Sequence, residues 1–471
     1  RLHGRERRPD GGLEVKLRDY QRIARGHLTD LPRCALWAKP GMGKTAAALH
    51  AAADLMLAGA SRNALVIAPV RVARDVWTDE VEKWPEIKPV VGTVVPIVGT
   101  AAQRRRALNT RASVHTINYE NIPWLIEEMA GKWWFDTVIA DEASKLRGFR
   151  LQQGGKRAHA LAQFAHTKIE RFIELTGTPA ANSLTALWGQ AWFLDGGVRL
   201  GRSFEAFKER WFQAFGQYGQ QTLEPLPFAH EQIIEALSDI CLTLDPRDWF
   251  DLREPVYTRR LVKLPAAAEK IYKTFRREMY AALALDEVKA FNAAAKTMKC
   301  LQLANGAVYT DPEATKWEQV HTAKLEALEE IVEETTDSAV LVAYQFKPDR
   351  ERILKAFPKA VDISTPRGMA AFKAGDAAVG VAHPASVGHG VDGLQQVCNA
   401  LVFFGHWWDV EEREQMIERV GPMRQMQAGL DRPLFLYDLV AAGTIDEVVM
   451  QRHESKREVQ DLLMDAMRRG A

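Results

Sequence analysis

The sequence predicts an α/β protein with two lobes, each built on a parallel sheet wrapped by helices. Short apolar runs rich in β-branched residues alternate with helical stretches, which is the pattern of parallel strands covered by helices. These runs form two groups along the chain, which are residues 64–68, 137–140 and 172–175 and then residues 339–343, 379–382, 401–404 and 434–439. The length of 471 residues also exceeds what one compact core usually accommodates.

The two groups of strands are separated by a stretch from about 183 to 335 that is mostly helical in character. Within it, Ile271, Phe275, Met279 and Leu283 recur at every fourth position, which predicts one buried helical face. Prolines punctuate the middle of the stretch, and we expect the lobe boundary near residues 250–260. The predicted lobes are residues 1–255, with a helical insertion at about 183–250, and residues 256–471, with an insertion at about 265–335 and a C-terminal helix.

Composition limits the classes of protein to consider. The chain is 47% hydrophobic and 26% charged, contains no apolar run of membrane-spanning length and starts with a polar, basic segment, so neither a membrane span nor a secretory signal is expected. Its four cysteines are dispersed, without a zinc spacing or a disulfide framework, which favours a reducing, intracellular compartment. Because the net charge is only +1, a nucleic-acid partner would need a local basic surface.

Residues 38–45 fit the phosphate-binding loop, with Ala38 at the position of the first glycine. A predicted strand end at 34–37 precedes the loop and an alanine-rich helix at 46–53 follows it. Backbone N–H groups of such a loop surround a triphosphate, the lysine reaches the β and γ phosphates, and the hydroxyl ligates Mg²⁺. The predicted nucleotide-binding residues are Pro40, Gly41, Met42, Gly43, Lys44 and Thr45. The alternative is a chance Gly-Lys-Thr in an ordinary turn.

An apolar strand at 137–140 ends in two carboxylates, Asp141 and Glu142. An acidic residue at such a strand end can hold the Mg²⁺ that Thr45 also ligates, and the next carboxylate can orient and deprotonate the attacking water. We therefore predict Asp141 as a metal ligand and Glu142 as the catalytic base. Alone, an Asp-Glu pair is more often a solvated strand end or a helix cap.

The order of these motifs resembles helicase superfamily 2 and, within it, the Swi/Snf-type translocases, over nearly the whole chain. The resemblance implies two tandem RecA-like lobes that bind ATP between them, with Mg²⁺. Leu17–Gln21 resembles the adenine-reading element, which assigns Gln21 to the base, although a plain helix start would look the same. Residues 176–182, Thr-Gly-Thr-Pro-Ala-Ala-Asn, resemble the coupling motif and assign Thr176 and Thr178 to it. Ser144 stands where many relatives have histidine in the same coupling role.

Further segments resemble the DNA contacts of this family. They are residues 68–71 with 76–77 and 82–84, residues 116–120, residues 340–346 and the Gly-rich loop 383–395. The residues that this resemblance assigns to DNA are Arg71, Asn118, Tyr344, Gln345 and Ser386. The Gly-rich loop has one extra residue before Leu394, which leaves contacts at Asp392 and Gly393 open. Residues 403–408 resemble the aromatic segment, with interlobe packing as the alternative role.

The arginine-finger motif is present in altered form. Gln415 and Arg419 keep the common spacing, but Pro422 occupies the position of the second arginine and Arg424 follows two residues later. Either Pro422 redirects the turn so that Arg424 reaches the γ-phosphate, or Arg419 alone performs that task. We assign Gln415, Arg419 and Arg424, together with Lys44 and Glu142, to catalysis; the alternative for the arginines is a solvated helix end.

The resemblance implies an ATP-dependent motor that acts on duplex or branched DNA and binds it without regard to base sequence. Clusters of arginine and lysine in the sequence offer contacts to the DNA phosphates. The compact form resembles bacterial or phage-encoded members, which implies cytoplasmic work in replication, recombination or repair. Two alternatives remain open: a strand-separating or branch-migrating helicase, and a motor subunit that serves a nuclease or remodels protein–DNA complexes.

Overall fold

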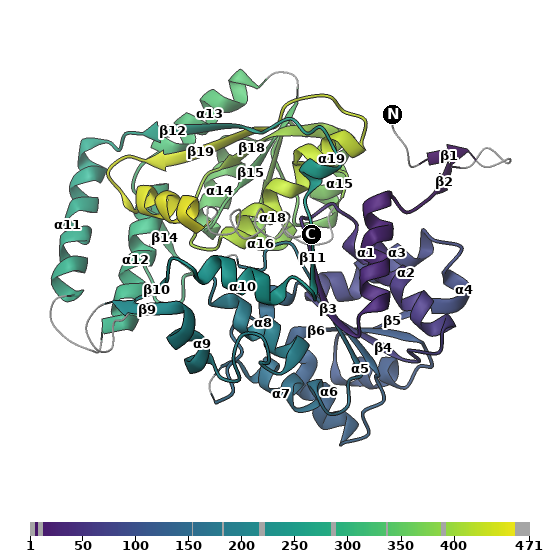
Figure 1. Ribbon diagram of the computed structural model, residues 1–471. Coiled ribbons are helices and arrows are strands. Elements are labelled where there is room, and N and C mark those ends of the chain that lie inside the picture. The colour runs from purple at the N-terminus through teal and green to yellow at the C-terminus, as the bar shows by residue number, and fades with distance from the viewer. Residues whose placement is uncertain are drawn as a thin grey trace. The chain divides into compact units, whose positions relative to one another are not determined.

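The computed structural model describes residues 5–7, 13–152, 154–180, 183–215, 222–283, 289–335, 338–387 and 392–456. These residues form two compact units, one up to Phe250 and one from Asp251 to Lys456. Each unit contains one parallel sheet with helices around it (Figure 1), so the predicted α/β class is confirmed. Within the described ranges, every helix is too short or too polar to span a membrane.

The sheet of the first unit has seven parallel strands in the order β11-β3-β8-β7-β4-β6-β5. Its strands are β3 Arg33–Ala38, β4 Ala64–Ala68, β5 Val94–Ile97, β6 Val114–Asn118, β7 Thr137–Asp141, β8 Arg171–Thr176 and β11 Cys241–Leu244. Every residue of β4, β6 and β7 is buried, as expected where helices cover both faces of a parallel sheet.

The helices of the first unit connect these strands. They are α1 Asp19–Asp30, α2 Lys44–Leu57, α3 Trp77–Glu82, α4 Lys88–Val91, α5 Ala101–Leu108, α6 Ile122–Met129, α7 Lys156–Ala165, α8 Ala186–Asp195, α9 Phe204–Trp211 and α10 Ala229–Leu237. Shorter helical turns are η1 Val72–Val76, η2 Tyr119–Asn121, η3 Ala143–Leu146 and η4 Pro246–Asp248, and two antiparallel hairpins are β1 Arg5–Arg7 with β2 Leu13–Val15 and β9 Phe212–Phe215 with β10 Thr222–Pro225.

The sheet of the second unit has six parallel strands in the order β12-β19-β18-β15-β17-β16. Its strands are β12 Val256–Val262, β15 Ala339–Ala343, β16 Val361–Asp362, β17 Val379–Ala382, β18 Cys398–Phe403 and β19 Phe435–Ala441, and a separate hairpin pairs β13 Ala307–Tyr309 with β14 Trp317–Gln319. The helices are α11 Ala266–Leu283, α12 Lys289–Asn305, α13 Ala323–Glu334, α14 Lys347–Ala356, α15 Pro366–Ala374, α16 Pro384–Val387, α17 Leu394–Val397, α18 Val410–Val420 and α19 Pro422–Gln427. Residues 445–456 are also helical.

The stretch between the two groups of strands differs from the expected helical insertions. Three strands interrupt the segment 183–250, and one of them, β11, joins the first sheet beside β3. A strand of four residues followed by Asp245-Pro246 gives too short an apolar run to stand out in the sequence.

The predicted buried face of α11 is wrong where its side chains are described. Ile271 and Phe275 are 42% and 38% exposed, whereas Ala268 and Tyr272 are buried. The side chains of Met279 and Leu283 lie outside the described part of the chain. The helix therefore packs through Ala268 and Tyr272, which lie beside the predicted stripe. The hydroxyl of Tyr272 also accepts a hydrogen bond from the N–H of Ile445.

Candidate functional site

The predicted phosphate-binding loop connects the buried strand β3 to α2. Gly41 and Gly43 have φ angles of 87° and 71°, a left-handed conformation that glycine adopts without steric cost. Lys44 is the first residue of α2, and its Nζ donates to the carbonyl of Ala38, 2.7 Å away. The loop, the lysine and the hydroxyl of Thr45 therefore lie at a helix N-terminus, which favours a bound anion.

Two other predicted segments lie against this loop. A Cβ added to Gly43 would be 2.0 Å from Nε2 of Gln21, so the amide of Gln21 lies beside the loop. The Oε1 of Gln21 accepts the N–H of Arg18 at 2.9 Å. A Cβ added to Gly177 would be 2.9 Å from Cδ of Pro40, so the segment predicted for coupling, which begins at Thr176 (the coupling segment), packs directly on the loop. Side chains at either glycine would displace these neighbours.

The acidic pair lies at the carboxyl end of β7. Asp141 is 6% exposed; its Oδ2 accepts the indole N–H of Trp77 at 2.9 Å and its Oδ1 accepts the N–H of Glu142 at 3.1 Å. Burial, and next the charge of Glu142, raise the pKa of Asp141 to about 6, while the ammonium of Lys44 acts in the opposite direction. The lysine of the loop and the carboxylate of β7 are thus close enough to interact electrostatically.

Glu142 has an unusual backbone conformation. Its φ and ψ angles are 57° and 54°, left-handed values that cost a non-glycine residue about 1–2 kcal/mol. The surroundings hold this conformation: the hydroxyl of Tyr119 donates to the carbonyl of Asp141 at 3.0 Å and reaches that of Glu142 at 3.4 Å, and the N–H of Lys145 donates to the carbonyl of Glu142 at 3.0 Å. Strained residues of this kind concentrate at functional sites.

The side chains present fit a magnesium ion. Mg²⁺ prefers hard oxygen ligands and is usually held by one or two carboxylates together with substrate phosphates. Thr45 and Asp141 supply such oxygens at the end of the sheet where the loop begins its helix. A buried carboxylate whose pKa is raised also gains from a nearby cation.

The coupling segment lies between the loop and the acidic pair, because β8 is hydrogen-bonded to β3 on one side and to β7 on the other. Thr176 ends β8 fully buried, and its Oγ1 accepts the N–H of Thr178 at 3.1 Å. Ser144, 1% exposed, lies in η3 just after the acidic pair. Ala181 and Asn182 lie outside the described residues.

The predicted DNA-contacting residues of the first unit follow two neighbouring strands. Arg71 lies half-buried between β4 and the π-helical turn η1. Asn118, the last residue of β6, is 6% exposed, and its amide donates to Oε2 of Glu120 at 2.8 Å. Strands β4 and β6 pair in parallel, which places both residues at the same edge of the sheet.

The predicted DNA-contacting residues of the second unit also follow neighbouring strands. Tyr344 and Gln345 follow β15, and Ser386 follows β17 in α16. The rings of Tyr344 and His383 are 5.8 Å apart, and the hydroxyl of Ser386 donates to the carbonyl of His383 at 2.7 Å. Residues 388–391 of the Gly-rich loop lie outside the described part of the chain.

The second unit has two departures from the family motifs, the shifted Arg424 and the extra residue in the Gly-rich loop, and these two segments contact each other. Helix α18 ends at Val420 and α19 begins at Pro422, which separates Arg419 from Arg424. Arg424 forms an ion pair with Asp392, with 2.5 Å between Nη1 and Oδ1. Gln415 is buried within α18, 6% exposed, and Arg419 is half-buried in its last turn. The displaced arginine is thus held by the loop that carries the extra residue.

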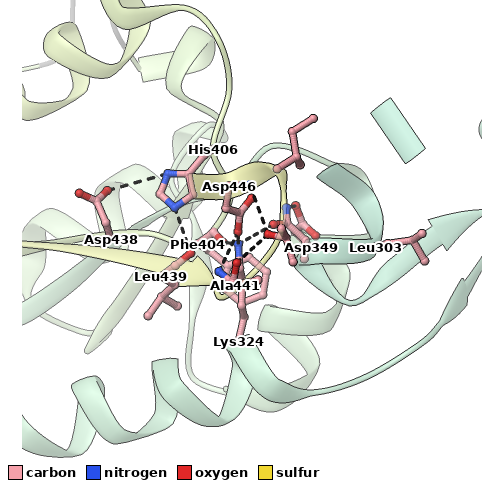
Figure 2. Close-up of polar contacts among 12 residues, drawn as sticks. Leu303, Lys324, Asp349, Phe404, His406, Asp438, Leu439, Ala441 and Asp446 are labelled. Atoms are coloured by element: carbon pink, nitrogen blue, oxygen red, sulfur yellow. Dashed lines mark hydrogen bonds and ion pairs between the residues drawn. The ribbon is translucent and has the colours of Figure 1, made fainter. Parts of the chain in front are cut away.

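A buried polar network in the second unit was missed in the sequence (Figure 2). The ammonium of Lys324, a fully buried side chain, lies 2.6 Å from Oδ2 of Asp446, 2.9 Å from Oδ1 of Asn305 and 3.1 Å from the carbonyl of Phe404. The amide of Asn305 donates in turn to Asp349 at 2.8 Å. A sequence signal does exist, because Lys324 shares the helical face of the buried Leu328 and Ile331.

Three further ion pairs were also missed. Arg413 pairs with Asp438 through two hydrogen bonds of 2.7 and 2.9 Å and covers the ring of Phe403. Asp245, a buried carboxylate at the end of β11, bonds Arg247 at 2.7 Å and lies 3.8 Å from Nζ of Lys39 in the phosphate-binding loop. Asp245 and Arg247 are neighbours in one turn, whereas the other two pairs join residues that are far apart in the sequence.

Comparison with known proteins shows extensive similarity. Residues 27–305 match the model of the SNF2-related domain. Putative protein p41 of Acyrthosiphon pisum secondary endosymbiont phage 1 is 50% identical over 457 residues, which cover 96% of this chain and 98% of the relative. The structure of the Sulfolobus solfataricus SWI2/SNF2 ATPase core in complex with dsDNA is 19% identical, with 96% of this chain and 94% of that chain covered and a TM-score of 0.43.

Proposed function

Because this chain belongs to the SNF2-related family, we propose that it is an ATP-driven motor that moves along duplex DNA. One observation carries the proposal: the phosphate-binding loop, the coupling segment and the acidic pair follow three adjacent strands, β3, β8 and β7, at one edge of the first sheet. That arrangement joins nucleotide binding, hydrolysis and a connecting element in one site. The phage relative supports a role in a phage-infected bacterial cell.

Each residue of this site has a proposed role in hydrolysis. Lys44 and the backbone of the loop bind the phosphates, Gln21 contacts the base, and Thr45 and Asp141 hold the metal. Magnesium, when bound, neutralises charge on the β and γ phosphates. Glu142 orients and deprotonates the attacking water, and its strained backbone fixes the direction of its carboxylate. Thr176, Thr178 and Ser144 connect this chemistry to movement.

We expect DNA to be held mainly through its phosphates. Arg71 and Asn118 in the first unit and Tyr344, Gln345 and Ser386 in the second are the proposed contacts. Contacts with the phosphate backbone position the duplex without reading its sequence. The cycle of nucleotide binding, hydrolysis and release then steps the protein along the backbone.

The test is ATP turnover with no DNA and with single-stranded, duplex, forked and RNA substrates. We expect duplex DNA to stimulate turnover, and Lys44→Ala and Glu142→Gln each to abolish it. Glu142→Gln should still bind nucleotide, because the change removes the base and leaves the phosphate contacts. Equal turnover with and without DNA would contradict the translocase. Displacement of a triplex strand without unwinding of a tailed duplex would separate duplex tracking from strand separation.

The arginines of the second unit are tested separately. An arginine finger contributes about 10³- to 10⁵-fold to the rate. We propose that Arg419 and Arg424 both act in hydrolysis, supported for Arg424 by the ion pair that fixes its side chain. Arg419→Ala and Arg424→Ala should each lose turnover while nucleotide binding persists. If only Arg419→Ala loses turnover, Arg424 has a structural role as the partner of Asp392.

A further inference from the structure

Two hydrogen bonds connect the segments predicted to contact DNA with the acidic pair. We propose that Trp77 and Tyr119 are positioning residues that hold Asp141 and Glu142 and make their geometry depend on the DNA-contacting segments. This inference rests on the proposed function for the identity of the nucleic acid and of the reaction. The proposed connection between DNA binding and hydrolysis lies within the first unit.

Trp77 belongs to the first DNA-contacting segment. It follows the π-helical turn η1, which begins next to Arg71, and its backbone N–H closes that turn on the carbonyl of Val72. Turns of this type are rare and frequently occur at functional sites. The indole is fully buried and donates to Oδ2 of Asp141 at 2.9 Å. A shift of η1 therefore moves the donor of a buried carboxylate.

Tyr119 belongs to the second DNA-contacting segment. It follows Asn118 directly, is 2% exposed, and donates its hydroxyl proton to the carbonyl of Asp141 at 3.0 Å. That carbonyl belongs to the peptide unit that leads into the left-handed backbone of Glu142. The two segments are also joined to each other, because the hydroxyl of Thr116 donates to the carbonyl of Ala73 within η1.

These contacts give Trp77 and Tyr119 different roles. Trp77 fixes the rotamer of the carboxylate proposed to ligate the metal, since a second donor, the N–H of Glu142, holds its other oxygen. Tyr119 fixes the peptide that directs the proposed base. Neither side chain needs to touch the nucleotide, and both respond to the elements that carry Arg71 and Asn118.

The decisive variants are Trp77→Phe and Tyr119→Phe, which remove one donor each and retain the ring. Trp211→Phe is the matched control, because Trp211 is also a buried tryptophan of the first unit whose indole donates at 3.1 Å, but to Gln232. The first readout is the affinity for a fluorescent ADP analogue, measured by fluorescence anisotropy with and without Mg²⁺ and in the absence of DNA. The second is the ratio of ATP turnover with duplex DNA to turnover without it.

Trp77→Phe should reduce the gain in nucleotide affinity that Mg²⁺ provides by about tenfold, the scale of one hydrogen bond to a charged group, with magnesium-free affinity unchanged. Tyr119→Phe should leave both affinities unchanged and reduce the stimulation ratio by a similar factor. Trp211→Phe should retain both readouts. An unchanged magnesium effect in Trp77→Phe, or an equal loss in Trp211→Phe, would overturn the inference. A wild-type chain that DNA does not stimulate would contradict the proposed function instead, and the magnesium readout would still decide the role of Trp77.

Discussion

Glu174 is a buried carboxyl on β8, two residues before the coupling segment. It is 1% exposed, and among the described residues neither of its oxygens has a hydrogen-bond partner. Its register neighbours on the flanking strands are Ala35 and Ala140, which offer no polar side chain. Burial, and next the charge of Asp195, raise the pKa of Glu174 well above its ordinary value of 4.5. The charged form is therefore disfavoured in the folded state.

This shift gives stability a defined dependence on pH. The pKa of Glu174 is higher in the folded state than in the unfolded state. The contribution of this carboxyl to the free energy of unfolding is therefore fully present below about pH 4.5 and is lost as pH rises through the folded-state pKa. Glu174→Met, which places an adaptable apolar side chain in the same space, should stabilise the protein by about 1–3 kcal/mol at pH 7.5 and by less at pH 4.5. Thermal unfolding at both pH values measures the difference.

Glu174→Gln serves as the control for this prediction, because it retains the size and the polarity and removes the charge. Its stability should lose the pH dependence that the wild-type carboxyl causes. A Glu174→Met variant that is less stable than the wild type at pH 7.5 would show that the carboxyl has a stabilising partner in solution.

At this scale, the residues to which the sequence assigns a role lie in contiguous motifs, and those roles stay predictions. The loop at 38–45 and the pair Asp141-Glu142 are short runs, and their residue types together with the strand before each indicate a chemical role. Trp77 and Asp141 are 64 residues apart, and their hydrogen bond depends on how α3 packs on the sheet. No local pattern encodes such a pair, so the positioning contacts emerged only with the fold.

Among the elements, α13 has an organising role in the second unit. Its Lys324 contacts residues that follow two strands, Phe404 after β18 and Asp446 after β19, as well as Asn305 at the end of α12 (Figure 2). Asp446 is itself fully buried and also accepts the N–H of Ala441 at 3.0 Å. The closest opposite charge to each partner is thus the other, at 2.6 Å. Burial raises the pKa of the nearby carboxyl of Asp349, and the ammonium of Lys324 acts to lower it.

Lys324→Met should destabilise the second unit by about 3–5 kcal/mol, because it leaves the carboxylate of Asp446 buried and uncompensated. Asp446→Leu should have a similar effect. The double variant should be more stable than the sum of the two single changes predicts, since it removes both charges. Thermal unfolding of the four proteins, completed as a double-mutant cycle, measures this coupling. Additive losses would mean that the two charges do not interact.

The elements also show where sequence patterns were sufficient. The predicted runs 64–68, 339–343 and 379–382 coincide with β4, β15 and β17, because buried parallel strands are continuous apolar segments. The pattern failed for β11, a strand of four residues, and for α11, where Ile271 and Phe275 are exposed. In α11 the repeat of four residues suggested a core face, but packing selected Ala268 and Tyr272.

For the whole molecule, the basic clusters are partly neutralised by the chain itself. Several arginines that the sequence offered as phosphate contacts form ion pairs, namely Arg105 with Glu128, Arg157 with Glu120, Arg259 with Glu454 and Arg260 with Glu334. These pairs are partly exposed, so each contributes little to stability. With a net charge of +1, we expect the proposed affinity for DNA to come from a limited set of arginine and lysine side chains.

Binding to duplex DNA should therefore weaken with salt and vary little with sequence. The logarithm of the binding constant falls with the logarithm of salt concentration by about 0.9 for each phosphate that the protein neutralises. Arg71→Ala should reduce that slope by about one, because it removes a proposed phosphate contact. Arg105→Ala should change the slope less, since Glu128 already engages that guanidinium. Fluorescence anisotropy with two duplexes of unrelated sequence, from about 50 to 200 mM salt, measures the dependence of affinity on salt and on sequence. An affinity that is independent of salt would rule out binding through the phosphates.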